Sequence, residues 1–216
     1  MIALEPLGDR AWLARFGSEQ EAAAWAAAVR NSAWPGVLDV VLAYQTAAVF
    51  ADPETLDLDE LRSKLSALQP AQAERSTGKL VELPVLYDGP DLSEVAERLG
   101  LEPAEVIEFH SGTTYHVFAI GFRPGFPYVG YLPPKLSGLP RRDSPRTRVP
   151  AGSVAIVGRQ AGVYPEVSPG GWHLLGRTPL AIVNLERGHF PIRAGDRLRF
   201  VSISPEEFSA RHGEVL

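Results

Sequence analysis

The stretch Gly121-Phe-Arg-Pro-Gly-Phe-Pro-Tyr-Val-Gly130 opens the part of the chain that decides the fold. From Gly121 to Pro179, 59 residues contain 10 glycines and 10 prolines. That share of Gly and Pro would by itself favour disorder, but aromatic side chains are too frequent here for a disordered segment. We therefore expect ordered loops that join short strands, at 153–158, 172–175, 180–184 and 197–203. These strands predict a compact β-barrel or sandwich with small flanking helices.

Upstream of this stretch, strand and helix patterns alternate. Period-2 apolar runs predict strands at 2–7, 11–16, 37–43, 47–51 and 79–85. Ser18 with Glu21, and Asp57 with Glu60, predict the starts of two amphipathic helices between them. The last six of these elements follow the split βαβ order of ferredoxin-like folds. We predict an α+β chain, with a ferredoxin-like domain at 1–84 and a β-barrel domain at 85–216.

Three further helices are expected in the second domain. Asp91 with Glu94 predicts the cap of a short helix that ends at Gly100, and Pro103 opens the next one. Ser204, followed by Pro205 and Glu207, predicts a capped helix near the end of the chain.

Composition and charge exclude several classes of protein. The 216 residues are 45% hydrophobic and 22% charged, which is typical of globular proteins. Residues 1–120 hold 8 basic and 19 acidic side chains, and 121–216 hold 13 and 7. The net charge of −5 disfavours a general nucleic-acid binder, while the basic second part suits anions. Without cysteine, disulfides and thiolate chemistry are excluded, and we expect a soluble, cytoplasmic protein that does not interact with membranes.

Arginines are concentrated at 141–148. The planar donor fork of arginine suits carboxylate or phosphate oxygens. We interpret Arg141 and Arg142, beside Asp143, as a solvated surface. Arg146 and Arg148 alternate along an extended chain and are the better candidates for binding an anion.

Hydrogen-bonding groups follow in two glycine-rich segments. The candidates for holding a substrate are the side chains of Gln160, Tyr164 and Ser168 and the backbone at Gly170 and Gly171. His110, at a helix end, is a further candidate, with a structural hydrogen bond as the alternative. The five histidines lack metal-ligand spacing, so we expect no metal site.

Aromatic side chains gather in the opening stretch and just after it, at Phe122, Phe126, Tyr128 and Tyr131. Glycines beside them allow close backbone approach, and the rings offer a flat apolar wall. Such a wall suits the core of a partner interface. The alternative is that the rings fill a gap in the protein's own core.

These segments together resemble one family. The matching motifs are Gly121–Gly130, Pro145-Arg-Thr-Arg-Val-Pro-Ala-Gly-Ser153, Gly162-Val-Tyr-Pro165, Ser168-Pro-Gly-Gly-Trp172 and Gly176-Arg-Thr-Pro179. They resemble the family of the sporulation-kinase inhibitor KipI, also described as allophanate hydrolase subunit 1 or the B-type subunit of prokaryotic 5-oxoprolinase, over nearly the whole chain. The resemblance implies a cyclophilin-like barrel from about residue 85. It also implies a sister barrel-type subunit (the C-type component of 5-oxoprolinase) and a third subunit (the A-type component).

The first function that the resemblance implies is that of an enzyme subunit, inactive alone. The complex would open the lactam of 5-oxo-L-proline to L-glutamate, driven by ATP that binds through the assembled complex. Arg146, Arg148 and Arg177 would stabilise developing charge.

Two alternatives remain. A regulatory protein would hold the helical domain of a histidine kinase in the groove around Phe122, Phe126 and Tyr128. A urea or allophanate module would act on a carboxylated cofactor, and it ranks third because the chain has no biotin-carrier segment.

Overall fold

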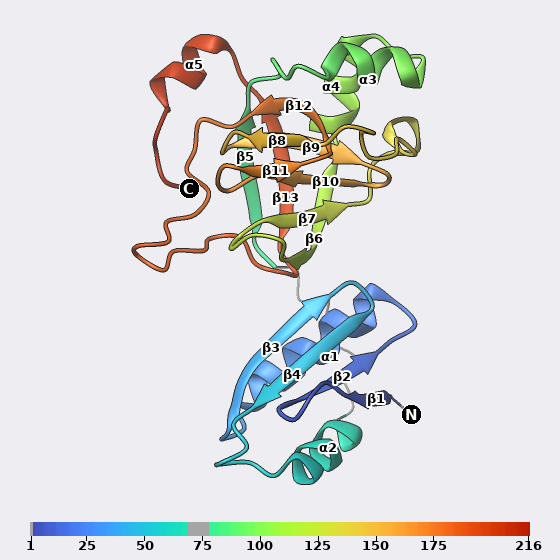
Figure 1. Ribbon diagram of the computed structural model, residues 1–216, viewed down its shortest axis with the longest axis vertical. Helices are drawn as coiled ribbons and strands as arrows, with labels where there is room; N and C mark the ends of the chain where they lie inside the picture. Colours follow the sequence, from blue (N-terminus) through green and yellow to red (C-terminus); the bar gives the residue numbers. More distant parts are fainter. Residues whose placement is uncertain (1, 69–77) are drawn as a thin grey trace. The chain divides into compact units, whose positions relative to one another are not determined.

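The computed structural model describes residues 2–68 and 78–216, which belong to two compact units divided between residues 77 and 78 (Figure 1). We call them the first and the second unit.

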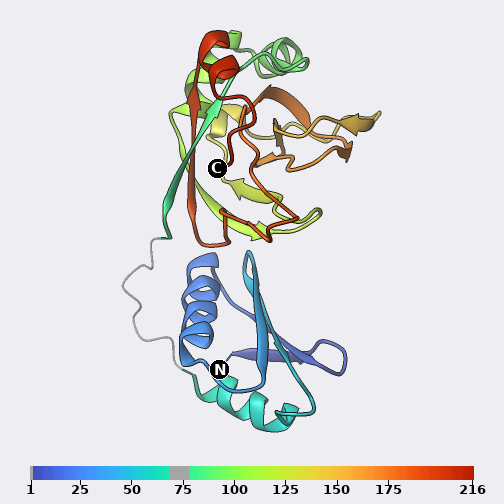
Figure 2. The same cartoon turned by 90° about the vertical axis from the view of Figure 1, so that its left-hand side faces the viewer.

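The first unit is an antiparallel sheet with two helices. Its strands pair in the order β1 (Ala3–Pro6), β2 (Ala11–Arg15), β4 (Thr46–Ala51) and β3 (Val37–Ala43). Helix α1 (Glu19–Ser32) lies along this sheet, and α2 (Leu58–Ala67) follows β4 (Figure 2). The apolar stripe of α1 is buried, at Ala22, Trp25, Ala26 and Val29.

Both predicted helix caps of this unit are confirmed. The Ser18 hydroxyl accepts a hydrogen bond from the Glu21 backbone N–H at 3.2 Å. The Asp57 carboxylate accepts from the N–H groups of Asp59 and Glu60. Each cap satisfies donors that the first turn of a helix leaves without a partner, so short-range chemistry sets both helix starts.

The prediction that the strand at 79–85 completes the ferredoxin-like domain is wrong. Strand β5 (Leu80–Val85) pairs in parallel with β13 (Arg197–Ser202) and buries Val81, Leu83 and Val85 in the core of the second unit. At the free edge of β2, where a split βαβ fold would receive its last strand, β1 pairs instead. The structural boundary therefore precedes β5, and the first unit lacks the final strand of the ferredoxin-like pattern.

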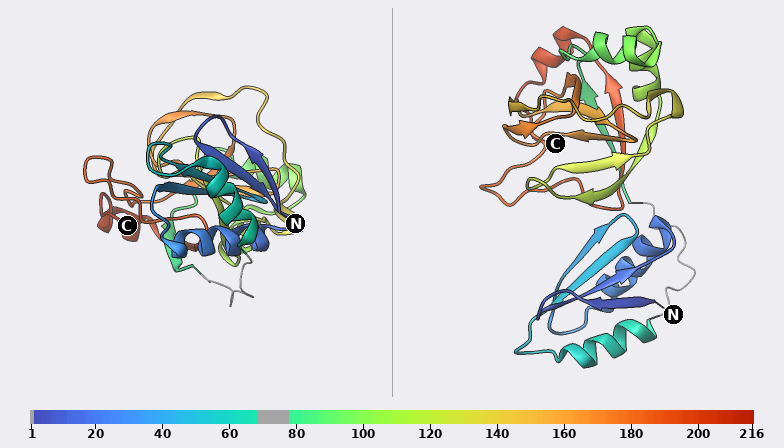
Figure 3. Two further views of the ribbon diagram at one scale, coloured as in Figure 1. Left: turned by 90° about the horizontal axis from the view of Figure 1, so that it is seen from below. Right: turned by 45° about the vertical axis from the view of Figure 1, so that its right-hand side comes forward.

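The second unit is a mainly antiparallel sheet with helices around it. Its ladders run in the order β5, β13, β6 (Thr114–Ile120), β7 (Pro127–Gly130), β10 (Gln160–Val163), β9 (Ser153–Val157) and β12 (His173–Arg177). A separate two-stranded ribbon pairs β8 (Arg146–Val149) with β11 (Ser168–Gly170), and we call it the β8–β11 ribbon. Figure 3 shows the ribbon beside the larger sheet.

The expected closed barrel is not formed. In the described residues, β5 and β12 end the series of ladders and do not form a ladder with each other. One antiparallel bridge joins Leu86 to Arg177 across the opening, with both N–H···O distances at 2.9 Å. The fold is thus mixed α/β, with a curved, open sheet rather than the cyclophilin-like barrel expected for 85–216.

Helices lie at the ends of this sheet. These are α3 (Leu92–Leu99), α4 (Pro103–Ser111), a 3-10 turn at Pro134–Leu136 and α5 (Pro205–Ala210). The predicted capping box of α5, between Ser204 and Glu207, is confirmed. No helix in 2–68 or 78–216 is both long and apolar enough to cross a bilayer.

The segment between β5 and α3 lies close to the backbone of β12 at Gly89, and a substitution there tests this contact. Its N–H donates to the Leu175 carbonyl at 3.0 Å, and a Cβ built on it would lie 2.3 Å from the Leu174 oxygen. Because backbone atoms cannot give way, we expect Gly89→Ala to destabilise the protein by about 1–3 kcal/mol in denaturant unfolding. Gly121→Ala is the control, since its nearest atom would be 3.9 Å away. Equal stability of the two variants would contradict this packing.

Candidate functional site

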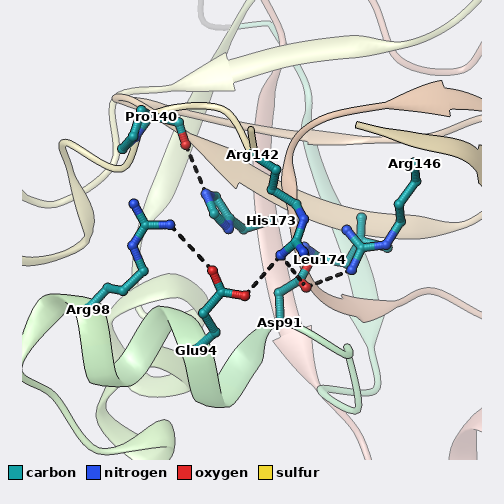
Figure 4. A network of polar contacts seen from close by, with 8 residues as sticks. All are labelled: Asp91, Glu94, Arg98, Pro140, Arg142, Arg146, His173 and Leu174. Atoms are coloured by element: carbon teal, nitrogen blue, oxygen red, sulfur yellow. Dashed lines mark hydrogen bonds and ion pairs between the residues drawn. The ribbon is translucent and has the colours of Figure 1, made fainter. Parts of the chain in front are cut away.

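A cluster of ionic side chains joins three segments of the second unit (Figure 4). We call it the Asp91 cluster, and its members are Asp91, Glu94, Arg98, Arg142 and Arg146. One oxygen of Asp91 accepts hydrogen bonds from Arg142 Nη1 at 2.8 Å and Arg146 Nη2 at 2.6 Å. Its other oxygen accepts from the Leu174 backbone N–H at 2.7 Å. A single carboxylate therefore connects the start of α3, the arginine segment and β12.

Asp91 does not cap α3 as predicted. Its side chain makes no capping hydrogen bond and points instead to Arg142 and Arg146. Glu94, one turn into α3, adds a second carboxylate, which accepts from Arg142 at 2.9 Å and from Arg98 at 3.4 Å. Asp91 and Glu94, which have the spacing of a local cap, thus both bind Arg142 of the distant arginine segment, and Glu94 also binds Arg98 on its own helix.

The Asp91 carboxylate stays ionised although it is buried. Its side chain is 3% exposed. Burial by itself would raise the pKa of Asp91, but the hydrogen bonds from Arg146 and from the Leu174 N–H, with the charges of both arginines, hold it below its ordinary value. Arg142 is therefore part of a partly buried network around Asp91, and its interpretation as a freely solvated surface residue is wrong.

Beside this cluster, aromatic rings pack under the β8–β11 ribbon. Phe126 lies at the centre, with ring centroids 5.0 Å from Tyr128, 5.2 Å from Tyr164 and 5.5 Å from Trp172. Tyr164 also contacts the ribbon: a Cβ on Gly170 would lie 2.3 Å from its hydroxyl oxygen. Glycine at this position therefore allows the ribbon to lie directly on the ring.

Several predicted site residues meet at this ribbon. Gly170 of β11 is paired with Arg146 of β8, and Ser168 is paired with Val149. The Ser168 hydroxyl is buried and has no hydrogen-bond partner in the described part of the chain. Burial raises the pKa of Tyr164 above its ordinary value. The hydrogen bond from the Trp172 N–H and the charges of Arg141 and Arg146 lower this pKa, but burial has the larger effect. Tyr164 is thus held as a neutral phenol close to cations.

The three predicted catalytic arginines have different surroundings. Arg146 is bound to Asp91. Arg177 forms a bidentate pair with Asp88, at 2.7 and 3.0 Å, and lies over the Phe208 ring. Arg148 is exposed and has no ion pair in the described residues. Of the three, Arg148 is the cation whose whole fork is available to a ligand.

The remaining predicted polar residues do not all belong here. His110 lies in the core, where its Nδ1 is 2.7 Å from the Tyr87 hydroxyl and its ring stacks on Phe200. Burial lowers the pKa of His110 to about 3, so it is neutral and structural, in agreement with the alternative interpretation. Gln160 begins β10, opposite Gly130. Gly171 is adjacent to the ribbon, and its carbonyl accepts from the Arg142 N–H.

The predicted aromatic interface divides into buried and exposed residues. Phe126 is 2% exposed, so it fills the core and cannot itself contact a partner. Phe122 is 56% exposed and Tyr131 is 39% exposed. The interface therefore stays a prediction for Phe122 and Tyr131 only, while Tyr128 is half-buried against the aromatic core.

A small hollow of about 210 Å³ lies beside the cluster, lined by Glu94, Arg98 and residues 140–144. Among the described residues, no group of His, Asp and Glu side chains could hold a metal ion. The site is therefore built from arginine forks, two carboxylates and a phenol, and it can bind an anionic or carbonyl oxygen.

Replacing Asp91 tests the cluster. Asp91→Asn leaves two partly buried arginines without their counter-charge, which should cost about 2–4 kcal/mol of folding free energy. Asp88→Asn is the matched control, because its pair with Arg177 is exposed and should contribute at most about 1 kcal/mol. Both can be measured by denaturant unfolding at neutral pH.

The same comparison has a defined pH dependence. Folding lowers the pKa of Asp91 below its ordinary value of 3.8. Its contribution should therefore be complete above pH 3.8 and decline as the pH falls through the folded-state pKa. A stability difference between wild type and Asp91→Asn that persists unchanged at lower pH would contradict an ionised Asp91.

Two curated relatives share this sequence over most of its length. A protein of Bacillus subtilis (strain 168), named as the B-type subunit of 5-oxoprolinase, is 37% identical, over 96% of this chain and 95% of its own. A protein of the same name from Escherichia coli O157:H7 is 41% identical, over 82% and 83%.

Solved structures share the fold. TTHA0988 is 42% identical with a TM-score of 0.81, and the match covers 90% of this chain. This chain spans only 40% of the length of TTHA0988. The urea carboxylase of Kluyveromyces lactis has a TM-score of 0.67 at 18% identity over 97% of this chain and 22% of its own, which shows a common fold alone.

A family model described as carboxyltransferase domain, subdomain C and D, matches residues 2–191. This match and the identities above confirm the resemblance expected from the sequence motifs. The chain belongs to the carboxyltransferase subdomain C and D family, together with proteins named as the B-type subunit of 5-oxoprolinase.

Proposed function

We propose that this chain is one subunit of a 5-oxoprolinase, which opens the lactam of 5-oxo-L-proline to L-glutamate with ATP hydrolysis. The observation that carries the proposal is the identity of 37% and 41% to proteins named as the B-type subunit of that enzyme, over most of both chains. Proteins so named belong to a complex, so the proposal includes a sister barrel-type subunit (the C-type component) and a third subunit (the A-type component).

The chemistry requires cations at the lactam oxygen. A lactam is a stable amide, and transfer of the γ-phosphoryl group of ATP to its carbonyl oxygen, with ADP as the leaving group, makes the carbonyl carbon open to attack by water. Water would add to that carbon, the C–N bond would break as the ring nitrogen takes up a proton, and a second water would hydrolyse the resulting acyl phosphate to glutamate and phosphate. Negative charge then accumulates on oxygen atoms, and preorganised donors lower the barrier. The ribbon presents Arg148 for this task, while Asp91 holds Arg146 beside it on the same strand. ATP would bind through the assembled complex.

The expected substrate-binding side chains Tyr164 and Ser168 are each 2% exposed, so they would support the ribbon from within and would not touch a substrate directly. Gly170 serves the contact of the ribbon with Tyr164, and Gly171 next to the ribbon is the glycine that could leave backbone open to a small ligand. Burial of His110 in the core excludes it from direct contact with a substrate, whereas Arg177, 52% exposed in its pair with Asp88, stays a candidate.

The first test is partner dependence. We expect the purified chain to release no appreciable glutamate from 5-oxoproline with ATP. Co-expressed with the A-type and C-type partners, it should give ATP-dependent release, which chromatography of glutamate measures. The controls omit ATP or this chain. Robust turnover by the isolated chain would overturn partner dependence, and an inactive full complex that still inhibits a histidine kinase would favour the regulatory alternative.

The second test is Arg148→Lys in the assembled complex. Lysine keeps the charge but loses the bidentate fork, so turnover should fall roughly 10-fold to 1000-fold, as when one transition-state donor is removed. Assembly and thermal midpoint should stay unchanged. Arg10→Lys, an exposed arginine of the first unit, is the matched control. Normal turnover by Arg148→Lys would make this arginine structural.

A further inference from the structure

The outer edge of β5 is an open strand edge. The Arg197 N–H donates to the Lys79 carbonyl and the Ile203 N–H to the Val85 carbonyl, so odd-numbered residues of this segment face β13. Backbone groups alternate in direction along a strand, and even-numbered residues therefore face the other way. Leu86 confirms this, because its N–H and C=O both bond Arg177 on the outer side.

Two residues of this edge have no backbone partner. β5 pairs with β13 alone, and no hydrogen bond within 2–68 and 78–216 reaches the outward N–H or C=O of Leu80 or Glu82. Beyond Glu82 the outer edge of β5 cannot accept a full strand, because Pro84 has no N–H and Leu86 is already bridged to Arg177. An edge of this kind is a template for another strand, and Pro is one of the devices that normally block it. Leu80 and Glu82 are left unblocked.

A pocket of about 730 Å³ lies along the same edge, lined by Lys79–Glu82, residues 188–191 and Leu216. Leu80 is 42% exposed and Phe190 is 40% exposed, so apolar surface borders the open backbone. Lys79 and Arg193 line the pocket without an ion pair in the described residues, whereas Glu82 is paired with Arg199. The pocket thus holds these two cations and, besides Glu82, the carboxylate of Asp196, which is 7% exposed and accepts from the Arg193 backbone N–H at 2.8 Å.

We propose that the β5 edge at Leu80 and Glu82 binds an extended strand of the sister barrel-type subunit. The strand would pair with the outward N–H and C=O groups, place an apolar side chain against Leu80 and Phe190, and carry an acidic residue toward Lys79 and Arg193. This proposal rests on the proposed function, which requires such a partner. In TTHA0988, the matched region makes up only 40% of a longer chain, so this fold also occurs covalently joined to further protein.

The decisive comparison is Glu82→Pro with Glu82→Ala. Both remove the carboxylate, but only proline removes the outward N–H, and Pro84 already occupies the equivalent outward position two residues later. Binding of the purified C-type partner is measured by calorimetry, with the thermal midpoint of each variant. We expect Glu82→Pro to raise Kd about tenfold or more and Glu82→Ala to change it less than about threefold.

A second pair keeps the test independent of folding. Leu80→Lys replaces the apolar contact by a third cation and should also weaken binding, while Leu38→Lys, a comparable change at an exposed leucine of the first unit, should not. Hydrogen exchange should slow at the Leu80 and Glu82 amides in the complex.

The outcomes separate the two proposals. A wild-type chain that does not bind the partner would overturn the proposed function. Normal binding by both Glu82→Pro and Leu80→Lys, with loss in Phe122→Ala, would place the interface at Phe122 and overturn the β5 proposal alone. Self-association of the chain that Glu82→Pro abolishes would also overturn it, in favour of a second copy.

Discussion

The Asp91 carboxylate is the interaction on which the organisation of the second unit depends. It accepts from two arginines and from the backbone of β12, so it ties α3 to segments 51 to 83 residues further along the chain. Such a group is costly to bury unless its charge and hydrogen bonds are satisfied. Satisfying it determines where the arginine segment runs, and this places β8 over the aromatic core.

From that constraint follows the division of labour among the arginines. Arg142 forms ion pairs with Asp91 and Glu94, and Arg146 forms one with Asp91, so both arginines stabilise the fold. Arg148, two residues along the same strand, keeps its fork for a ligand. A charged group that binds a transition state has to be held in position beforehand, because reorganising it during the reaction would raise the barrier. The rigid ribbon, stiffened by Pro145 and Pro150 and seated on Tyr164, provides that position.

Because the sheet is open, the start of β5, at the end away from the Leu86 bridge, has no neighbouring strand on its outer side among the described residues. One bridge between Leu86 and Arg177 joins the ends of the series of ladders, and the remainder of the β5 edge is unpaired among the residues that the structure describes. A closed barrel would have no edge to offer. The open sheet instead exposes backbone donors and acceptors beside a pocket lined by both apolar and charged side chains, and these groups suit a protein partner.

Short-range chemistry determined much of the fold from the sequence alone. The caps at Ser18, Asp57 and Ser204 and the apolar stripe of α1 appear where the residues predict them, because a cap or stripe involves neighbours within a few positions. The motifs around 121–130 and 145–179 were sufficient to place the chain in its family. The grouping of the arginines was not predicted, because Arg146 joins Arg142 at Asp91 while Arg148 is exposed.

What only the tertiary structure decided were pairings between distant residues. Asp91 and Glu94 have the pattern of a cap, yet Asp91 binds arginines that no local spacing connects to it. The β5 strand fits a ferredoxin-like order, but it pairs with β13. The contact between Glu82 of β5 and Arg199 of β13 joins residues that are 117 positions apart in the sequence. Phe126 is indistinguishable in sequence from an interface ring, and burial against Tyr164 and Trp172 made it core. Periodicity reports which face of an element is apolar, and only packing decides what covers that face.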